Sequence, residues 1–283
     1  MNEETLGAAV RDLACRLAAF SDSAALDAQT LLAHIIGKGR AWVLAHPEAA
    51  LSAAQRAALA QAVTRLENGE PLPYVLGHWE FFALDFIVNS DVLIPRPESE
   101  LLVETALQRL AHSRQPPRVL DVGTGCGCIA IALAAHNPQA RLMATDISAA
   151  ALQVARRNAA RHRVAGRIRF IQADLLPTPL PPFAFDVIVA NLPYIPTAAL
   201  QGLPIYRREP RLALDGGSDG LTLIRRLVEA APTVLAAGGA LLCEIEASQG
   251  LAAANLAQQA FPAASVSILP DLAGHDRLLS IQT

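Results

Sequence analysis

Apolar residues recur at every third or fourth position over the first part of the chain, a spacing that predicts amphipathic helices. Gly37 and Gly69 are expected to end two of these helices, and Ser52 to begin the last one. The apolar positions of the three helices are, in chain order, Leu6, Val10, Leu13 and Leu17; Leu26, Leu31, Leu32, Ile35 and Ile36; and Leu59, Val63 and Leu66. We therefore expect residues 1–70 to form a helical domain.

Short apolar runs alternate with Ala- and Leu-rich helical segments from residue 118 onward. The runs occupy residues 118–122, 141–145, 168–171, 187–190, 238–245, 266–269 and 277–281. Such alternation is typical of an α/β protein with a doubly wound sheet, in which ligands bind at the carboxyl ends of the strands. We expect these runs to form the sheet of a larger domain that spans residues 95–283.

Two prolines, Pro71 and Pro73, separate the helical part from the larger domain. Beyond them, an apolar run at 81–88 and a shorter one at 92–94 flank the polar residues 89–91. This pattern favours a β-hairpin whose turn lies at the polar residues. Residues 71–94 are therefore expected to be a hairpin linker.

The sequence Asn191-Leu192-Pro193-Tyr194 directly follows the apolar run at 187–190 and suits amino-group chemistry. The side-chain oxygen of Asn191 can accept one N–H of a planar NH2 group, and the main-chain oxygen of Leu192 can accept the other. The Tyr194 ring can lie against the plane of that group. Two acceptors that favour a pyramidal nitrogen make its lone pair more available in the transition state. The alternative interpretation is an ordinary strand that ends in a proline turn, and the motifs in the rest of the chain disfavour it.

A glycine-rich turn follows the run at 118–122 and precedes an Ala- and Ile-rich helical segment. Its residues are Gly123, Thr124, Gly125, Cys126 and Gly127. Glycines at alternating positions let the backbone approach a ligand closely. The spacing departs from the dinucleotide fingerprint, because Cys128 stands where its third glycine belongs, and the chain has no phosphate-loop motif. Nicotinamide and nucleoside triphosphate ligands are therefore disfavoured.

Two acidic residues at strand ends indicate an adenosyl ligand. Asp146 ends the run at 141–145, about twenty residues beyond the glycine turn, the spacing at which an acid meets a ribose. Asp174 follows the run at 168–171, where its carboxylate can accept an adenine amino group and Leu175 can pack on the ring. An aspartate before an apolar pair is also a common start of a helix, so this role of Asp174 has an ordinary alternative.

These motifs together resemble the protein-(glutamine-N5) methyltransferases that modify bacterial peptide chain release factors. The similarity runs over nearly the whole chain, and its most family-specific stretch is Leu93-Ile94-Pro95-Arg96-Pro97-Glu98-Ser99-Glu100. The other matching segments are residues 27–37, 73–77, 123–127, 191–194, 209–217 and 271–274. The resemblance implies a seven-stranded class I methyltransferase sheet. It also implies methyl transfer from S-adenosylmethionine to the side-chain nitrogen of the glutamine in the Gly-Gly-Gln motif of release factors.

The resemblance assigns residues to the cofactor. Residues 123–127 look like the S-adenosylmethionine loop, Asp146 like the ribose acid, and Leu175 like the residue beside the adenine, where relatives often have an aromatic side chain. We add Asp174 and Asn191 to this cofactor-binding set. Leu175 departs from the family pattern, and its aliphatic side chain weakens the stacking expected for adenine.

The resemblance also assigns residues to the acceptor. Residues 191–194 look like the pocket for the glutamine side chain, with Asn191, Pro193 and Tyr194 as the catalytic residues. Arg96 and Pro97 are similar to a segment that closes over the cofactor near the substrate channel. Leu192 departs from the family motif Asn-Pro-Pro-Tyr; its main-chain oxygen survives, but the fixed φ of proline is lost, and Pro193 restores that constraint only in part. The helical domain is expected to bind the protein substrate, with a packing cap as the alternative.

Composition restricts the remaining possibilities. The chain has 283 residues, 52% hydrophobic and 17% charged, with a formal net charge of -3, which argues against a broad nucleic-acid surface. No apolar stretch is long enough to span a bilayer, and the acidic N-terminus is unlike a signal peptide, so we expect a cytoplasmic protein without a membrane role. Four scattered cysteines suggest neither disulfides nor a metal site. We expect a monomer.

Three classes of function stay open at this point. The first is glutamine methylation of a release factor. The second is amino methylation of another target, either glutamine in a ribosomal protein or adenine in DNA, although the chain has no target-recognition region or basic face suited to DNA. The third is a non-catalytic cofactor-binding protein, which the departure at Leu192 makes conceivable and the retained motifs disfavour.

Overall fold

A computed structural model describes residues 5–111, 116–180 and 184–283 of the chain. The chain divides into two compact units, Met1–Gly77 and His78–Thr283, each of which has its own core. Among the described residues, no helix combines the length and the apolar character that crossing a bilayer requires. The domain limits expected from the sequence lie at residues 70 and 94, and they remain predictions.

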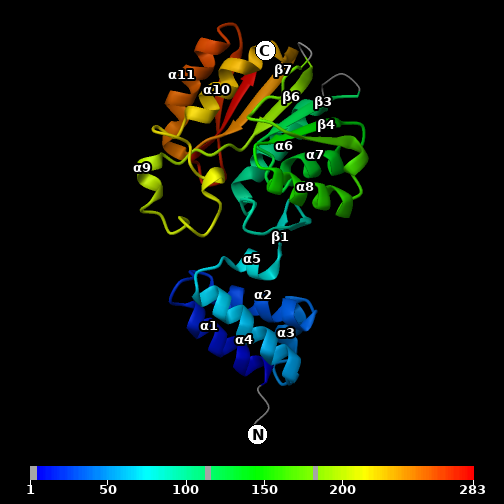
Figure 1. The fold of residues 1–283 in the computed structure, drawn as a ribbon, viewed down its shortest axis with the longest axis vertical. Coiled ribbons are helices and arrows are strands. Elements are labelled where there is room, and N and C mark those ends of the chain that lie inside the picture. The colour runs from blue at the N-terminus through cyan, green and yellow to red at the C-terminus, as the bar shows by residue number, and fades with distance from the viewer. Residues whose placement is uncertain (1–4, 112–115, 181–183) are drawn as a thin grey trace. The chain divides into compact units, whose positions relative to one another are not determined.

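The first unit is helical, as its apolar spacing predicts (Figure 1). Its helices are α1 (Leu6–Leu17), α2 (Ala24–Ile36), α3 (Arg40–Ala45), α4 (Ala53–Glu67) and α5 (Leu72–Leu76). Gly37 ends α2 with a φ of 66°, a left-handed conformation that suits glycine. Ser52 begins α4 in a capping box with Gln55. The short α5 lies where the sequence suggested only a linker, with Pro73 in its first turn.

The second unit begins with a β-hairpin that differs from the expected one. Its strands are β1 (His78–Phe81) and β2 (Leu84–Ile87), which pair antiparallel. The turn lies at Phe82 and Ala83, with φ values of 52° and 57°, so the apolar run at 81–88 is not one strand. Residues 92–94 form no strand. The sequence-based hairpin was wrong in its turn, because two apolar residues occupy left-handed positions that glycine or asparagine usually fills.

A seven-stranded sheet forms the centre of the second unit, as expected for a class I methyltransferase sheet. The strands are β3 (Arg118–Val122), β4 (Arg141–Asp146), β5 (Ile168–Gln172), β6 (Phe185–Ala190), β7 (Leu235–Glu244), β8 (Ser265–Pro270) and β9 (Asp276–Gln282). Their order is β5-β4-β3-β6-β7-β9-β8; β9 runs antiparallel to both of its neighbours, β7 and β8, whereas β5, β4, β3, β6 and β7 are parallel to one another. Because β4 and β6 lie on opposite sides of β3, the order reverses there, which places a ligand crevice at the carboxyl ends of these strands.

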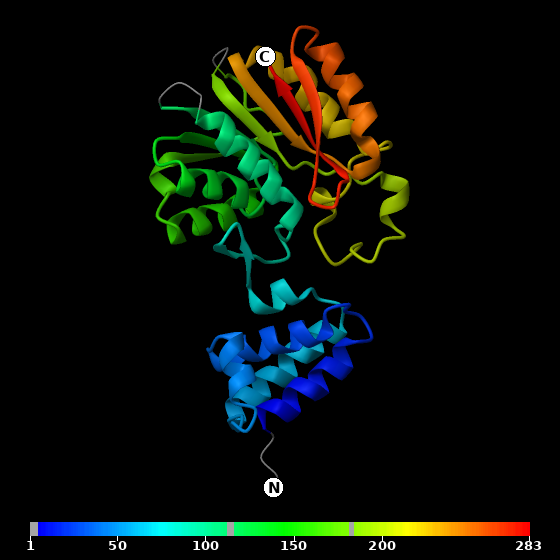
Figure 2. The same cartoon turned by 180° about the vertical axis from the view of Figure 1, so that it is seen from behind.

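Helices cover both faces of the sheet (Figure 2). Helices α6 (Glu100–Leu110), α7 (Cys128–His136) and α8 (Ala149–Arg161) contribute to one apolar core, and α10 (Thr222–Ala230) and α11 (Gly250–Ala260) to the other. Successive residues of β3 show the division, because Val119 belongs to the first core and Leu120 to the second. A further short helix, α9 (Thr197–Leu200), lies in the long connection between β6 and α10. The packed strands give the crevice a rigid base.

Candidate active site

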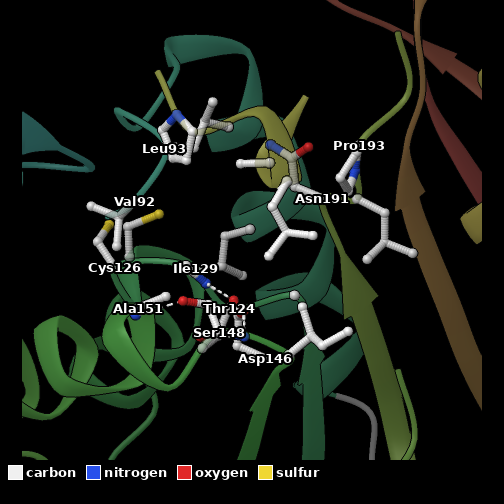
Figure 3. Close-up of a pocket in the computed structure, with 18 of the residues that line it drawn as sticks. Val92, Leu93, Thr124, Cys126, Ile129, Asp146, Ser148, Ala151, Asn191 and Pro193 are labelled. Carbon is white, nitrogen blue, oxygen red and sulfur yellow. Dashed lines mark hydrogen bonds between the residues drawn. The ribbon is translucent and has the colours of Figure 1, made fainter. Parts of the chain in front are cut away.

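A cavity of about 390 Å³ opens at the carboxyl ends of β3, β4 and β6. Its lining comes from the glycine turn, from the strand ends, and from the segments 90–99, 173–175 and 210–213. Asn191 and Pro193 lie toward one side of the cavity, whereas Thr124, Asp146 and Ser148 lie toward the other (Figure 3). Most of the expected acceptor and cofactor residues therefore line one cavity, although Pro97, Gly127 and Tyr194 are not among its lining residues.

The glycine turn adopts a backbone that its glycines make accessible. Gly123, Gly125 and Gly127 have φ values of 75°, 56° and 85°. The N–H groups of Gly123 and Thr124 both donate to the main-chain oxygen of Thr145, each at 2.9 Å. A Cβ built at Gly125 would meet no atom within 4 Å, so open space borders the backbone there. That space leaves room for the close approach of a ligand that the sequence predicts, although Gly127 is not among the residues that line the cavity.

Asp121 holds the glycine turn through hydrogen bonds. The sequence analysis did not identify this residue. It is fully buried, and its Oδ2 accepts the Thr124 hydroxyl at 2.6 Å and the Ala130 N–H at 3.2 Å. Its Oδ1 has no hydrogen-bond partner among the described residues. Burial raises the pKa of this carboxyl to about 7, against the opposing effect of the Thr124 hydrogen bond. Its short-range bonds connect β3 to the start of α7.

Asp146 lies at the end of β4 and lines the cavity. Its Oδ2 accepts the N–H of Gly125 at 2.8 Å, and its Oδ1 accepts the N–H of Ser148 at 2.9 Å. An ionised carboxylate has further lone pairs, so these two bonds leave capacity for ribose hydroxyls. Burial raises the pKa of Asp146. The geometry suits the predicted ribose role while also coupling β4 to the glycine turn.

The expected adenine side is less enclosed. Leu175 lines the cavity with a φ of 62°, and its main-chain oxygen accepts the Thr145 hydroxyl at 2.8 Å. Asp174 also lines the cavity, but its carboxylate pairs with the Arg226 guanidinium at 2.8 Å and is about half exposed. The sequence did not identify Arg226. Its salt bridge occupies part of the acceptor capacity that we assigned to the adenine amino group.

The Asn191 carboxamide is held by a residue from another part of the chain. Its Nδ2 donates to Ser99 Oγ at 2.8 Å, and Ser99 donates in turn to Glu244 Oε2 at 2.6 Å. The Tyr194 hydroxyl lies 3.4 Å from Glu244 Oε1, to which it donates. Glu244 is buried at the end of β7. Because Nδ2 is engaged, the Oδ1 of Asn191 is the carboxamide atom that remains to accept a ligand N–H.

The other residues of the motif have distinct environments. Leu192 is 4% exposed, and its side chain packs so closely on the turn that a Cβ at Gly123 would lie 2.9 Å from its Cδ2. Pro193 lines the cavity, whereas Tyr194 does not. Burial raises the pKa of the Tyr194 hydroxyl. The structure therefore places the Tyr194 hydroxyl in a hydrogen-bond network behind the cavity.

Glu209 joins two segments of the cavity wall. Its Oε2 accepts the N–H of Ile94 at 2.9 Å, and its Oε1 accepts from the Arg96 guanidinium. The glutamate side chain is 4% exposed and that of Arg96 30%. Arg96 lines the cavity as expected, whereas Pro97 starts a short 3-10 helix and is not among the lining residues. This bond connects the family-specific segment to the connection between β6 and α10.

Asn158 is another positioning residue that the sequence analysis missed. It is fully buried on α8, where its side chain exchanges hydrogen bonds with the main chain of Ile87 and also donates to the main-chain oxygen of Cys126 at 2.9 Å. It thus ties the hairpin to the glycine turn. One signal was available for such residues: a polar side chain at a helix position that the apolar spacing assigns to the core.

Comparisons with known proteins show which family this chain resembles. The family model described as the PrmC N-terminal domain matches residues 8–77, and that of the methyltransferase small domain matches residues 97–202. A protein of Moorella thermoacetica named release factor glutamine methyltransferase is 45% identical over 97% of this chain and 95% of its own. A protein of Chlorobaculum tepidum with the same name is 40% identical over 99% of each chain.

A solved structure supports the fold independently. The methyltransferase from Pyrococcus furiosus is similar with a TM-score of 0.53 over 79% of this chain and 98% of its own. At 18% identity, that likeness concerns the fold alone.

Proposed function

The chain belongs to the release factor glutamine methyltransferase family, and from that premise we propose that it methylates the side-chain nitrogen of the glutamine in the Gly-Gly-Gln motif of peptide chain release factors. The observation that carries the proposal is that Asn191, whose Nδ2 is held by Ser99 and whose Oδ1 has no hydrogen-bond partner among the described residues, lines the same cavity as the glycine turn and Asp146. One cavity thus offers a carboxamide acceptor beside an adenosyl site.

The residues present fit S-adenosylmethionine. Its ribose hydroxyls would bind Asp146, and its adenine would pack near Leu175. The open space at Gly125 would let the cofactor lie against the main chain of the glycine turn. When bound, S-adenosylmethionine supplies a methyl group on a positively charged sulfur, which is already activated for transfer. The protein is left with positioning and with polarisation of the acceptor.

The acceptor residues would hold the glutamine carboxamide through both of its N–H groups. Asn191 Oδ1 accepts one, and the main-chain oxygen of Leu192 accepts the other. These two bonds favour a pyramidal nitrogen over the planar amide, so they strengthen as the nitrogen attacks. The N–C bond would form as the bond between the methyl carbon and the sulfonium sulfur breaks, with the neutral thioether as the leaving group, and the nitrogen, now acidic, would then lose one proton to solvent.

The test is to identify the acceptor. Purified release factors, purified ribosomal proteins and adenine-containing DNA are each incubated with the enzyme and methyl-labelled S-adenosylmethionine, and label is located by tandem mass spectrometry. We expect one methyl group on the glutamine of the Gly-Gly-Gln motif. Label on a ribosomal-protein glutamine or on adenine, with none on the release factor, would replace the proposal by one of the two alternatives.

We also propose that the helical unit binds the release factor. Leu44 is 55% exposed on this unit, and Phe20 and Leu26 are each 43% exposed, so large apolar side chains are accessible there for a protein contact. In Leu44→Glu, we expect KM to rise for the intact release factor and to stay unchanged for a short Gly-Gly-Gln peptide. An equal effect on both substrates would favour a unit that serves only as a packing cap.

Finally, we propose a monomeric enzyme of the cytoplasm. The proposal accords with the composition of the chain and with a substrate that belongs to translation. Sedimentation equilibrium at micromolar concentrations should give a single species with the mass of one chain. A dimer under these conditions would contradict the monomer.

A further inference from the structure

Three hydrogen-bonding groups form a chain that begins at the acceptor motif and ends behind the cavity. Asn191 Nδ2 donates to Ser99 Oγ at 2.8 Å, and Ser99 donates to Glu244 Oε2 at 2.6 Å. Ser99 and Glu244 are 2% and 1% exposed, so water does not compete freely for these bonds. The three residues come from widely separated parts of the sequence, and only Asn191 and Ser99 line the cavity.

The direction of this chain depends on the proton inventory of its members. Ser99 has one hydroxyl proton, and an ionised Glu244 is an acceptor only. Ser99 must therefore donate to Glu244, which leaves its oxygen to accept from Asn191. The only donor of the carboxamide is its NH2 group, so Nδ2 faces Ser99 and Oδ1 faces away from it.

A protonated Glu244 would remove that constraint. Its own hydroxyl could donate to Ser99, and the Ser99 proton would then be free to point toward Asn191. The carboxamide of Asn191 could turn over and present its NH2 group to the substrate. An amide NH2 group donates hydrogen bonds but does not accept them. The NH2 group of Asn191 would then face the NH2 group of the glutamine with no acceptor between them, so this arrangement would not hold the glutamine nitrogen.

We propose that Ser99 and Glu244 are positioning residues that keep the Asn191 oxygen directed at the glutamine nitrogen, and that the ionisation of Glu244 sets this direction. The inference rests on the proposed function and deepens it. It adds two residues that act through Asn191 and gives the reaction a dependence on pH that neither the substrate nor Asn191 itself would supply.

The groups around Glu244 favour titration in the neutral range. Burial raises its pKa to about 7, while the Ser99 hydrogen bond, the positive charge of Arg277 and the Tyr194 hydroxyl lower it and the negative charge of Glu98 raises it. Arg96 and Arg277 also act on the neighbouring Tyr194. Arg277 is itself paired with Asp271, so its charge is partly compensated. The active, ionised form therefore predominates only above neutral pH.

The experiment measures kcat from pH 5.5 to 9 at saturating S-adenosylmethionine and release factor. For the wild type we expect kcat to rise through an apparent pKa of about 7. In Glu244→Gln the side chain cannot ionise and can donate to Ser99, so we expect kcat to be about tenfold lower at pH 8 and to lose this rise. Ser99→Ala should lower kcat by a similar factor, and Ser99→Thr, which keeps the hydroxyl, should restore most of it.

Asp121→Asn is the matched control, because it removes another buried carboxyl whose pKa is raised to about 7 but which bonds to the glycine turn. This variant should keep the rise of kcat with pH, whatever it does to cofactor affinity. Thermal unfolding and calorimetric titration with S-adenosylmethionine establish that each variant is folded and binds the cofactor.

Two results would overturn the inference. One is a Glu244→Gln variant, folded and saturated with cofactor, that keeps the wild-type rise; the other is a Ser99→Ala variant with unchanged kcat. Failure of the proposed function would look different, because the wild type itself would then leave the release-factor glutamine unmodified.

Discussion

Two buried carboxyl groups at the carboxyl edge of the sheet have similar surroundings, but their hydrogen-bond partners lie at very different distances along the sequence. Asp121 on β3 and Glu244 on β7 each accept a hydroxyl at 2.6 Å, and burial raises the pKa of each to about 7. The partners of Asp121 lie three and nine residues further along the chain, whereas Ser99 lies 145 residues from Glu244. The bonds of Asp121 on the cofactor side are thus local in sequence, whereas the bond of Glu244 on the acceptor side depends on tertiary structure.

The largest expected effect that tests this comparison is on the pH dependence of the unfolding free energy. The fold favours the protonated form of both carboxyls, so the native state binds more protons than the unfolded state between pH 4 and pH 7. Each group therefore contributes stability that is fully present below about pH 4 and is lost as the pH rises through about 7. The loss is on the order of 3 kcal/mol for each group.

Urea unfolding at pH 5 and pH 8 measures this difference. Asp121→Asn and Glu244→Gln should each remove about half of the decrease in unfolding free energy between the two pH values. Asp186→Asn is the comparison variant; it changes a carboxyl on β6 whose Oδ2 accepts the N–H of Arg118 at 2.8 Å. Full wild-type decreases in both Asp121→Asn and Glu244→Gln would show that neither carboxyl is stabilised in its protonated form.

The next effect separates the two sides through ligand affinity. Asp146→Ala removes the carboxylate assigned to the ribose and an acceptor of the Gly125 N–H, so we expect the Kd for S-adenosylmethionine to rise by about 50-fold. KM for the release factor should change much less. Calorimetry and initial rates measure the two quantities, and an unchanged Kd would remove Asp146 from the cofactor site.

A smaller effect concerns Leu192, which belongs to the acceptor motif but packs on the cofactor turn. Leu192→Pro fixes the φ of the residue whose main-chain oxygen is the proposed acceptor, and we expect kcat to rise by about threefold. The same change removes a buried side chain and should lower the unfolding free energy by about 2 kcal/mol. A variant slower than the wild type at a temperature where both are folded would show that Leu192 is no defect.

The smallest effect is expected on the adenine side. Asp174 and Arg226 form a salt bridge in which each side chain is about half exposed, so solvent screens it. Asp174→Ala should change the unfolding free energy by less than about 1 kcal/mol. Its Kd for S-adenosylmethionine should rise by about threefold, as calorimetry can measure. A rise as large as that of Asp146→Ala would give the two acids equal weight in binding.

The features that the sequence predicted well are those encoded by neighbouring residues. Apolar spacing gave α1, α2 and α4, and Gly37 and Ser52 marked helix ends correctly. The runs that became the sheet also placed Asp146 and residues 191–194 at strand ends. The hairpin failed, because tertiary packing holds Phe82 and Ala83 in a turn that local preference disfavours.

Roles that depend on distant partners could not be predicted. Ser99 and Glu209 lie within the segments that carried the family resemblance, yet only the fold shows that they bond to Glu244 and to Arg96. A usable signal was present for Glu244, since a carboxylate that closes an apolar strand is costly to bury without a function or a partner. The same signal applied to Asp121.

The most direct test of the account is single-turnover methylation of a release factor by the wild type and by Asn191→Ala, each saturated with S-adenosylmethionine. Asn191→Ala removes the side-chain acceptor while leaving the glycine turn and Asp146 in place. We predict a rate at least about 100-fold lower, with the Kd for S-adenosylmethionine within about threefold of the wild-type value. Equal single-turnover rates would contradict the claim that this carboxamide holds the glutamine nitrogen.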